Sequence, residues 1–460
     1  MFFLGLMYPR AFAIGATSVC RISGGWGNEG LIPGSSPTND GTIRYMPNWL
    51  ATVTTLLNNI QAAGYVVHYD IWNEPDLGSF WAGTQAQFFE MWRQTHLKIR
   101  ELQPGASIIG PSLAYYDATW MGQFLDYVKA NNVVPDVLNW HEWTYTSIPG
   151  NHANAVALLA ARSIPLTRFG VAEYVSENEQ FLPDRLVGFL QRLESVGVEF
   201  AGHACWPDPG MGGASNCVSA VMNGIVTNES PKRPRSTWWV YKGYADISGR
   251  LVGVTQLNGT STIAGKDSAL GTANVLIGNH GGVPVDVQFT NLSSSPYLII
   301  GGQVRVKAYR IANNSYNAVP TLPTMIDSDY AVVGDSITVG LPSFAGGDAY
   351  IVQLVGTQDL IPQVNLATEE LGWDWSQGAG GAVETFTIKP GSVGSSFSEV
   401  TVSGLLRQYP LRDVIAATGL HSFRVQAVNA AGAALDSNEL VGDVVGITVP
   451  TAPTNLRLIG

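Results

Sequence analysis

The hydrophobic positions of residues 14 to 206 follow two alternating periods. Short apolar runs, typical of buried strands, alternate with stretches whose apolar residues recur every three or four positions, as on one face of a helix. The predicted strands cover residues 14–23, 66–72, 107–112, 136–143, 168–174 and 200–206. The predicted helices cover residues 48–63, 85–102, 119–131, 152–163 and 184–197. Such repeated strand–helix units imply an α/β domain with a parallel sheet that is covered on both faces.

Beyond about residue 240 the pattern changes to alternation of apolar and polar positions, with Gly and Ser between the runs. Such alternation is typical of strands that bury one face, so residues 241–357 are predicted to form a β-sandwich. Residues 358–448 are predicted as a further all-β module, because the segment 423–432 is similar to a late strand of a fibronectin type III module. Residues 449–460 are predicted as a linker or the start of another module.

The composition describes a folded protein of more than one domain. The 460 residues exceed the usual size of one hydrophobic core. Hydrophobic residues make up 45% and charged residues 13%, unlike the composition of disordered chains. The net charge of -11 argues against nucleic acid or an anionic membrane as partner, and it is compatible with a neutral polysaccharide. No apolar run approaches the ~20 residues that a membrane span needs.

The cysteine and histidine patterns predict no metal site. An odd count of three cysteines gives no disulfide framework, and two interpretations of Cys205 and Cys217 stay open: they pair across one loop, or both are free thiols. The seven histidines are scattered and the cysteine spacing fits no zinc pattern. No phosphate-binding Gly-rich loop followed by Lys-Ser or Lys-Thr occurs, so no cofactor is expected.

The stretch His68–Asp76 carries the strongest candidate chemistry. It begins as an apolar strand and stops abruptly at Asn73-Glu74-Pro75, because proline cannot extend the hydrogen-bonded ladder. A carboxylate at the end of a strand is where an α/β barrel places catalytic groups. Glu74 is therefore predicted to be catalytic.

The tetrapeptide Trp72-Asn-Glu-Pro75 resembles the acid/base strand of retaining glycoside hydrolases of the large (β/α)8 clan. Within that clan the chain looks most like the β-xylosidase and α-L-iduronidase group, family 39, which carries a sandwich after its barrel. The resemblance implies a TIM-type barrel over residues 1–240, with Glu74 as acid/base on its fourth strand. It also implies a nucleophile three strands later, which is Glu173. Glu142 and Glu177 are the competing candidates for that role.

Further residues are expected to bind the sugar. The resemblance implies that Asn73 holds the 2-hydroxyl and that Trp206 is a platform for the ring, with a turn-capping Asn and a core Trp as the alternatives. His141 can reach the carboxylates or a hydroxyl, or it is a satisfied core residue. Arg21 could orient the nucleophile through a charge-assisted hydrogen bond. The aromatic candidates for lining subsites are Trp81, Trp143 and Tyr145.

Three strands should precede the strand of Glu74 in a complete barrel, yet only one convincing strand lies before residue 48. The sequence therefore leads to the expectation that the barrel lacks its first strands at the N-terminus. The first residues are apolar but have no positively charged start, so a signal peptide is not clearly present.

The resemblance implies an extracellular retaining glycosidase that acts on oligo- or polysaccharides in the manner of a β-xylosidase. Glucanase, mannanase, glucuronidase and iduronidase activities are the alternatives within the clan, because specificity depends on loops. A non-catalytic carbohydrate-binding protein on a degenerate barrel is the alternative of another class. The sequence carries no signal for an oligomeric state.

Overall fold

The structure of the chain is a computed structural model. It describes residues 2–13, 15–23, 46–217, 219–268, 270–299, 301–341 and 346–356, and beyond these residues 361–365, 370–374, 383–390, 399–403, 408–410, 419–429, 434–436 and 440–444. The chain divides into two compact units, which are described separately. The first consists mainly of residues up to Ser176 and of Arg192–Ala204, and the second of Glu177–Gln191 and the residues from Cys205.

Six parallel strands form the sheet of the first unit. They are β1 (Ser18–Ile22), β2 (Val67–Ile71), β3 (Ile108–Leu113), β4 (Val137–Glu142), β5 (Phe169–Tyr174) and β6 (Phe200–His203). Each strand pairs with the next one along the chain, so the spatial order is β1-β2-β3-β4-β5-β6. All six carboxyl ends consequently meet at one edge of the sheet, where parallel α/β folds place their functional side chains.

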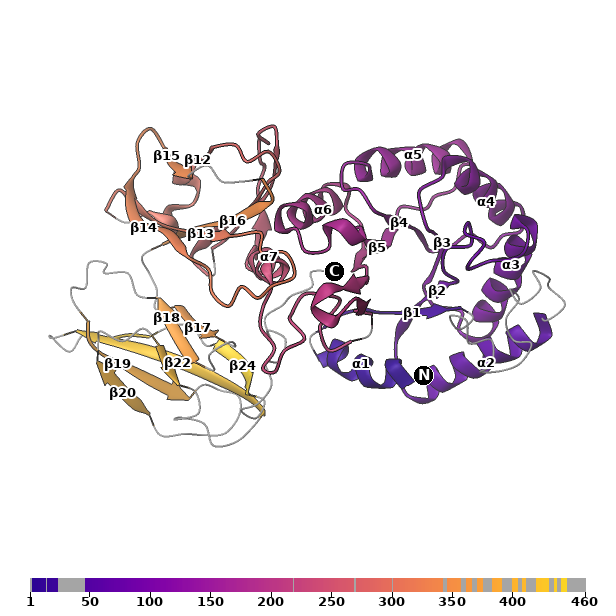
Figure 1. Cartoon of the computed structure of the whole chain (residues 1–460), viewed down its shortest axis with the longest axis horizontal. Coiled ribbons are helices and arrows are strands. Elements are labelled where there is room, and N and C mark those ends of the chain that lie inside the picture. Colours follow the sequence, from indigo (N-terminus) through magenta and orange to yellow (C-terminus); the bar gives the residue numbers. More distant parts are fainter. Residues whose placement is uncertain are drawn as a thin grey trace. The chain divides into compact units, whose positions relative to one another are not determined.

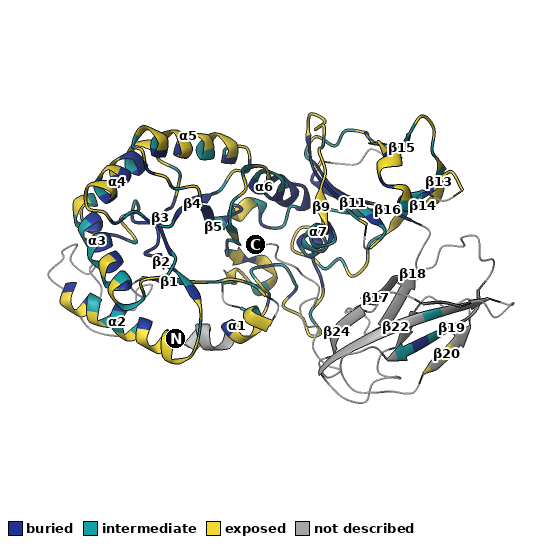
Figure 2. Cartoon of the chain, turned by 180° about the vertical axis from the view of Figure 1, so that it is seen from behind, coloured by how far each residue is buried: buried dark blue, intermediate teal, exposed yellow. Residues whose placement is uncertain are grey.

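One helix precedes β1 and others follow the strands, and helices lie around the curved sheet (Figure 1). They are α1 (Phe2–Ala13), α2 (Met46–Ala62), α3 (Gln85–Leu102), α4 (Ala118–Ala130), α5 (Ile148–Ala161) and α6 (Pro183–Val196), the last of which crosses from the second unit into the first. Thr84 and Gln87 form a capping box at the start of α3, which satisfies backbone N–H groups that the helix itself leaves free. In Figure 2 the inner sides of α2 to α5 are buried and their outer sides exposed.

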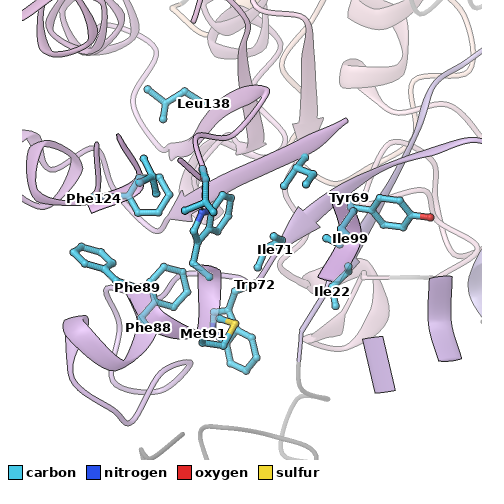
Figure 3. Close-up of a cluster of buried hydrophobic side chains, with 14 of the residues drawn as sticks. Ile22, Tyr69, Ile71, Trp72, Phe88, Phe89, Met91, Ile99, Phe124 and Leu138 are labelled. Atoms are coloured by element: carbon cyan, nitrogen blue, oxygen red, sulfur yellow. Dashed lines mark hydrogen bonds between the residues drawn. The ribbon is translucent and has the colours of Figure 1, made fainter. Parts of the chain in front are cut away.

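The apolar core of this unit lies between the sheet and its helices. Alternate residues of β2, Tyr69 and Ile71, belong to it, together with Phe88, Phe89 and Met91 of α3 (Figure 3). Because side chains of a strand alternate between its two faces, the intervening residues of each strand point to the opposite, inner face. That inner face holds most of the polar residues described below.

The described strands of the second unit are antiparallel. An extended sheet has the order β14-β13-β16-β11-β10-β9, and β12 pairs with β15. Their bounds are β9 (Arg250–Leu251), β10 (Thr260–Asp267), β11 (Thr272–Asn279), β12 (Val285–Thr290), β13 (Gln303–Ile311), β14 (Thr324–Ala331), β15 (Ser336–Leu341) and β16 (Asp348–Val355). Both sheets contribute side chains to one apolar core, among them Val306, Val339 and Val352. A β-rich region after the parallel sheet is therefore confirmed, and its finer assignment as a sandwich stays a prediction.

The remaining elements are short or lie near the C-terminus. They are β7 (Pro207–Asp208), β8 (Ala214–Ser215), α7 (Ser236–Ala245), β17 (Ile361–Asn365), β18 (Glu370–Asp374), β19 (Val383–Pro390), β20 (Val400–Ser403), β21 (Gln408–Pro410), β22 (Gly419–Asn429), β23 (Ala434–Asp436) and β24 (Leu440–Val444). Most of the segment predicted to resemble a late fibronectin strand lies in β22, and its residues 430–432 lie outside the described residues. The fibronectin assignment and the linker at 449–460 stay predictions.

Several expectations from the sequence can be compared directly with the structure. One strand, β1, precedes β2 in the described part of the chain, as the pattern predicts, and the sheet has six parallel strands instead of the eight of a complete barrel. Residues 2–13 form a helix that the sequence did not predict. A disulfide joins Cys205 to Cys217, so the first of the two open interpretations holds. No helix among the described residues is long and apolar enough to cross a membrane.

Candidate active site

The carboxyl edge of the sheet has an unusual backbone. Trp72 and Glu74, just past β2, have φ angles of 76° and 49°, Ser112 in β3 has 60°, and Val175, just past β5, has 77°. Positive φ values are uncommon for residues other than glycine, and a β-branched residue such as Val175 is strained there. Such residues cluster at functional sites, because the surrounding structure holds them in place. The strain therefore marks the edge at which both predicted glutamates lie.

Glu74, His141 and Glu173 come together at this edge. Nδ1 of His141 lies 3.0 Å from Oε1 of Glu74, and its Nε2 lies 3.9 Å from Oε1 of Glu173. One ligand-type atom from each of the three residues lies within 4.8 Å of the other two. The two carboxyl groups, 99 positions apart in the sequence, thus share one small space with an imidazole between them.

Arg21 on β1 reaches across the inner face of the sheet to Glu173. Its Nη1 donates a hydrogen bond of 2.7 Å to Oε1 of Glu173, and its Nε donates one of 3.2 Å to Oδ2 of Asp70. Burial alone would lower the pKa of Arg21, but the charges of Asp70 and Glu173 outweigh it and raise the pKa. Arg21 therefore stays charged, and the orienting contact predicted for it is present.

Burial sets the protonation of the other two groups. It raises the pKa of Glu74 above its usual range, against an opposing effect of Arg21. It lowers the pKa of His141 to about 4, although the Glu173 carboxylate acts in the opposite direction. His141 is thus neutral near pH 7, and Glu74 keeps its proton to a higher pH than an exposed glutamate would.

The predicted sugar-binding residues Asn73, Trp143 and Tyr145 differ in their surroundings. Asn73 is buried, and its side-chain oxygen has no hydrogen-bond partner in the described part of the chain. Trp143 is half-buried, lies edge-on to His141 with ring centres 5.6 Å apart, and donates from Nε1 to the carbonyl oxygen of Ala114. Tyr145 is buried under the guanidinium of Arg192. Binding roles for these residues stay predictions.

The ring of Trp81 is buried against other aromatic side chains. It is 3% exposed, lies edge-on to Trp72 and Phe88, and donates from Nε1 to the carbonyl oxygen of Thr84. These contacts are those of a core residue that also fixes the start of α3. The subsite role that the sequence suggested for Trp81 stays a prediction.

Trp206 belongs to the second unit, whose position relative to the first is not described. It is half-buried, and its backbone N–H donates to Oδ1 of Asn216. Its role as a platform for the sugar stays a prediction.

The two competing candidates for the nucleophile, Glu142 and Glu177, have surroundings that differ from those of Glu173. Glu142 is 2% exposed and accepts hydrogen bonds from Trp140, Ser147 and Asn151, which occupy both of its oxygens. Glu177 is exposed in a short 3-10 helix of the second unit. Neither is among the groups gathered around His141.

Three buried polar residues of the inner face were missed. Asp70, Ser112 and Asn139 are fully buried on β2, β3 and β4, and they are hydrogen-bonded to one another in that order. Burial raises the pKa of Asp70, and the contacts with Arg21 and Ser112 oppose that shift. A charged residue between the apolar Tyr69 and Ile71 was the available signal, because carboxylates are rarely buried without a partner.

Glu74, His141 and Glu173 also have the chemistry of metal ligands, and their atoms lie close enough to share an ion. The sequence predicted no metal. The Arg21 guanidinium, 2.7 Å from Glu173, already supplies a positive charge to that carboxylate and would repel a cation beside it. The arrangement therefore fits acid–base chemistry better than metal binding.

Comparisons with known proteins agree with this chemistry. Residues 63–162, which include Glu74 and His141, match the profile of glycosyl hydrolases family 39. A 3-O-alpha-D-galactosyl-alpha-L-arabinofuranosidase of Bifidobacterium longum subsp. longum is 25% identical over 346 residues, which are 64% of this chain and 28% of that protein. A beta-xylosidase of Caldicellulosiruptor saccharolyticus is 30% identical over 76 residues, 16% of this chain and 15% of that protein.

The fold has a relative among solved structures. A protein from Neocallimastix frontalis superposes with a TM-score of 0.63 over 76% of this chain and 83% of its own, at 23% sequence identity. The chain spans less than a third of the length of the two curated relatives named above. Together the family match and the two glycosidases support an enzyme of the glycoside hydrolase class.

Proposed function

We propose that the protein is a retaining glycoside hydrolase in which Glu173 is the nucleophile and Glu74 the acid/base. The observation that carries this proposal is the distance between them, since oxygen atoms of the two carboxyl groups lie within 4.8 Å. Retaining enzymes hold their two carboxyl groups about 5–5.5 Å apart, whereas inverting enzymes leave room for a water between them.

In the first step Glu74 acts as the acid. Burial raises its pKa, which favours the protonated form that the acid role needs, and Glu74 donates its proton to the leaving oxygen. The Glu173 carboxylate, oriented by Arg21, attacks the anomeric carbon from the opposite side and forms a glycosyl ester. The bond between the anomeric carbon and the leaving oxygen breaks as the ester bond forms.

In the second step Glu74, now ionised, takes a proton from a water molecule. The water attacks the anomeric carbon and releases Glu173, which restores both carboxyl groups. The neutral imidazole of His141, 3.0 Å from Glu74, can exchange a hydrogen bond with either protonation state of that carboxyl. The side-chain oxygen of Asn73, which has no hydrogen-bond partner among the residues that the structure describes, is suited to accept a hydrogen bond from a sugar hydroxyl, as the family resemblance implies for the 2-hydroxyl.

The substrate class is proposed from the relatives. One acts on an alpha-L-arabinofuranoside and the other is a beta-xylosidase, so both names refer to pentose glycosides. We therefore place pentosides ahead of the glucosides, mannosides and uronides that the sequence also left open. Among pentosides, the β-xyloside is the first choice from the sequence and the α-L-arabinofuranoside is the one that the longer match favours. An extracellular location belongs to the same proposal.

The test measures hydrolysis of nitrophenyl glycosides of β-D-xylose, α-L-arabinofuranose, β-D-glucose and β-D-mannose. The parent chain is expected to release nitrophenol from a pentoside, and Glu173→Gly to lose at least about 10³-fold in kcat because no nucleophile remains. Added azide should restore turnover of Glu173→Gly and give a glycosyl azide of inverted configuration. Glu177→Gln is the control, since that carboxylate is exposed and outside the cluster.

Two results would contradict the proposal. Full activity of Glu173→Gly would show that Glu173 is not the nucleophile. A first product of the parent with inverted configuration at the anomeric carbon would exclude a retaining mechanism. Binding of xylo- or arabino-oligosaccharides by calorimetry without turnover of any glycoside would favour the non-catalytic binding protein.

A further inference from the structure

Six residues of the first unit form a continuous path of hydrogen bonds that leaves β5 at Glu173 and returns to β5 at Ala172. The path passes through one residue of each of the strands β1, β2, β3 and β4. We propose that its interior members Asp70, Ser112 and Asn139 are positioning residues for the nucleophile, which act through their neighbours and touch no substrate. This inference rests on the proposed function and adds residues to it.

The first half of the path holds the carboxylate of Glu173. Arg21 donates from Nη1 to Glu173 and from Nε to Asp70, so its guanidinium plane is fixed at two edges. A guanidinium that is bound at only one edge can still swing about its long side chain. Asp70, being fully buried, is the group that prevents this movement.

The second half holds the backbone beside Glu173. The hydroxyl of Ser112 donates to Oδ1 of Asp70 and accepts from Nδ2 of Asn139 at 2.8 Å. Oδ1 of Asn139 in turn accepts the backbone N–H of Ala172 at 2.9 Å. Ala172 directly precedes Glu173, so the path fixes the nucleophile at its carboxylate and at its main chain.

Ser112 connects the path to the acid/base as well. Its carbonyl oxygen accepts the backbone N–H of Glu74 at 2.9 Å. Ser112 itself has a φ of 60° and lies at an irregularity in the pairing of β3 with β4. One residue with an uncommon backbone conformation thus links Glu74 to the hydrogen bonds that end at Glu173.

The burial of these groups argues for a role beyond stability. Asp70, Ser112 and Asn139 have no exposed surface. Burying polar groups costs free energy, and their hydrogen bonds at best offset that cost. Apolar residues at these positions would therefore stabilise the fold at least as well. What a satisfied polar network adds is a unique geometry. Here the network fixes the position of the Glu173 carboxylate and of the backbone before it.

The experiment begins with Asp70→Asn, which keeps the size of the side chain and weakens its contact with Arg21. On the pentoside that the parent hydrolyses, kcat is expected to fall roughly 10–100-fold with KM within about threefold, since small displacements of reacting groups cost rates of this size. Glu142→Gln is the matched control: it too neutralises a buried carboxyl, but its partners lie outside the path.

A double-mutant cycle separates positioning from general damage. In a Glu173→Gly background with azide, the diffusible nucleophile no longer depends on the path. Asp70→Asn is then expected to change the rescued rate by less than about threefold. A purely structural role would give the same loss in both backgrounds. If Asp70→Asn does not fold, Ser112→Ala replaces it in the cycle, because it breaks the path and leaves the Arg21–Asp70 pair intact.

The outcomes of this test are distinct from those of the proposed function. Equal losses in both backgrounds, or losses no larger than those of Glu142→Gln, would overturn the positioning role while the parent remains an active glycosidase. An inactive parent whose azide-treated Glu173→Gly variant is also inactive would instead overturn the proposed function. A large loss confined to the background that contains Glu173 would establish the inference.

Discussion

At the scale of the single residue, burial is the main influence on the pKa of two histidines. The pKa of His141 in the site and that of His96 in α3 are both lowered to about 4, chiefly because their rings are removed from water. Both are therefore neutral at the pH at which most enzymes work. His96 lies away from Glu74 and Glu173 and packs near Trp92, so it allows the effect on stability to be measured apart from catalysis.

We expect His96→Asn to make the first unit less sensitive to acid. The unfolded chain takes up a proton on this residue as the pH falls below 6.5, whereas the folded state does so only near 4. The folded state therefore loses stability across that window, by about 3 kcal/mol for His96. Urea unfolding at pH 7 and pH 4 should show a smaller loss for the variant than for the parent. Equal losses would show that His96 is protonated in the folded state.

The sequence was informative for residues whose position along a motif carries meaning. Glu74 could be selected because it ends a predicted strand, and Glu173 because the family resemblance implies a glutamate at a strand end three strands later. Arg21 could be selected because it lies on an early predicted strand. For Asp70 the sequence signals only a buried charge between Tyr69 and Ile71. Its partners, and those of Asn139, could not be predicted, because they lie on other strands and the pairing register sets which side chains meet. The burial that changes the pKa of His141 is likewise a property of the packed sheet.

At the scale of the element, the close packing of strands against a helix or another strand depends on single glycines. The Trp92 ring of α3 lies directly over Gly110 in β3, where a Cβ atom would overlap it. Gly170 in β5 is covered in the same way by the ring of Phe200. These positions need the absence of a side chain for reasons of space, because their φ angles are not in the left-handed region.

Gly110→Ala is accordingly expected to destabilise the first unit by about 1–3 kcal/mol, the usual cost of overpacking a filled core. Gly105→Ala, in the loop before β3, is the control, because a Cβ there meets no atom within 4 Å. The midpoints of thermal unfolding of the two variants provide the comparison. Equal midpoints would mean that Trp92 can move aside at no cost.

Helices and strands could be predicted from the hydrophobic periodicity wherever the apolar positions recurred regularly. α3 and β4 lie where the pattern predicts them, and β1 is shorter than predicted by several residues. α1 was missed because Phe2–Ala13 is apolar on nearly all sides and contains Pro9, so it shows no helical stripe. The burial of Trp81 was also not predicted, because a loop position in the sequence does not reveal whether its ring is buried.

At the scale of the whole molecule, the chain combines a parallel α/β unit with an antiparallel β-rich unit. The change in hydrophobic period near residue 240 predicted this order, whereas the second compact unit already takes in Glu177–Gln191 and the residues from Cys205. That division depends on which side chains pack together and not on local pattern. The domain boundaries proposed from the sequence stay predictions.

Reduction of the Cys205–Cys217 disulfide is expected to destabilise the second unit. The bond closes a loop between residues 12 positions apart, and loops of this size contribute about 3 kcal/mol by restricting the unfolded chain. Thermal unfolding with and without a reductant measures the change. Cys20→Ser should keep the same sensitivity, because burial raises the pKa of the Cys20 thiol to about 11 and leaves it unreactive. An unchanged midpoint after reduction would contradict the expectation.

The hydrogen bond between Arg21 and Glu173 joins residues that are 152 positions apart in the chain. Contacts between distant positions form late, after the intervening segments have folded and the entropy of closing a long loop has been spent. The hydrogen bonds within α3 and α4 join residues that are close in sequence. The contact between Arg21 and Glu173 forms only when the five strands β1 to β5 are paired in register. During gradual unfolding, the capacity for catalysis should therefore disappear before the helical signal does.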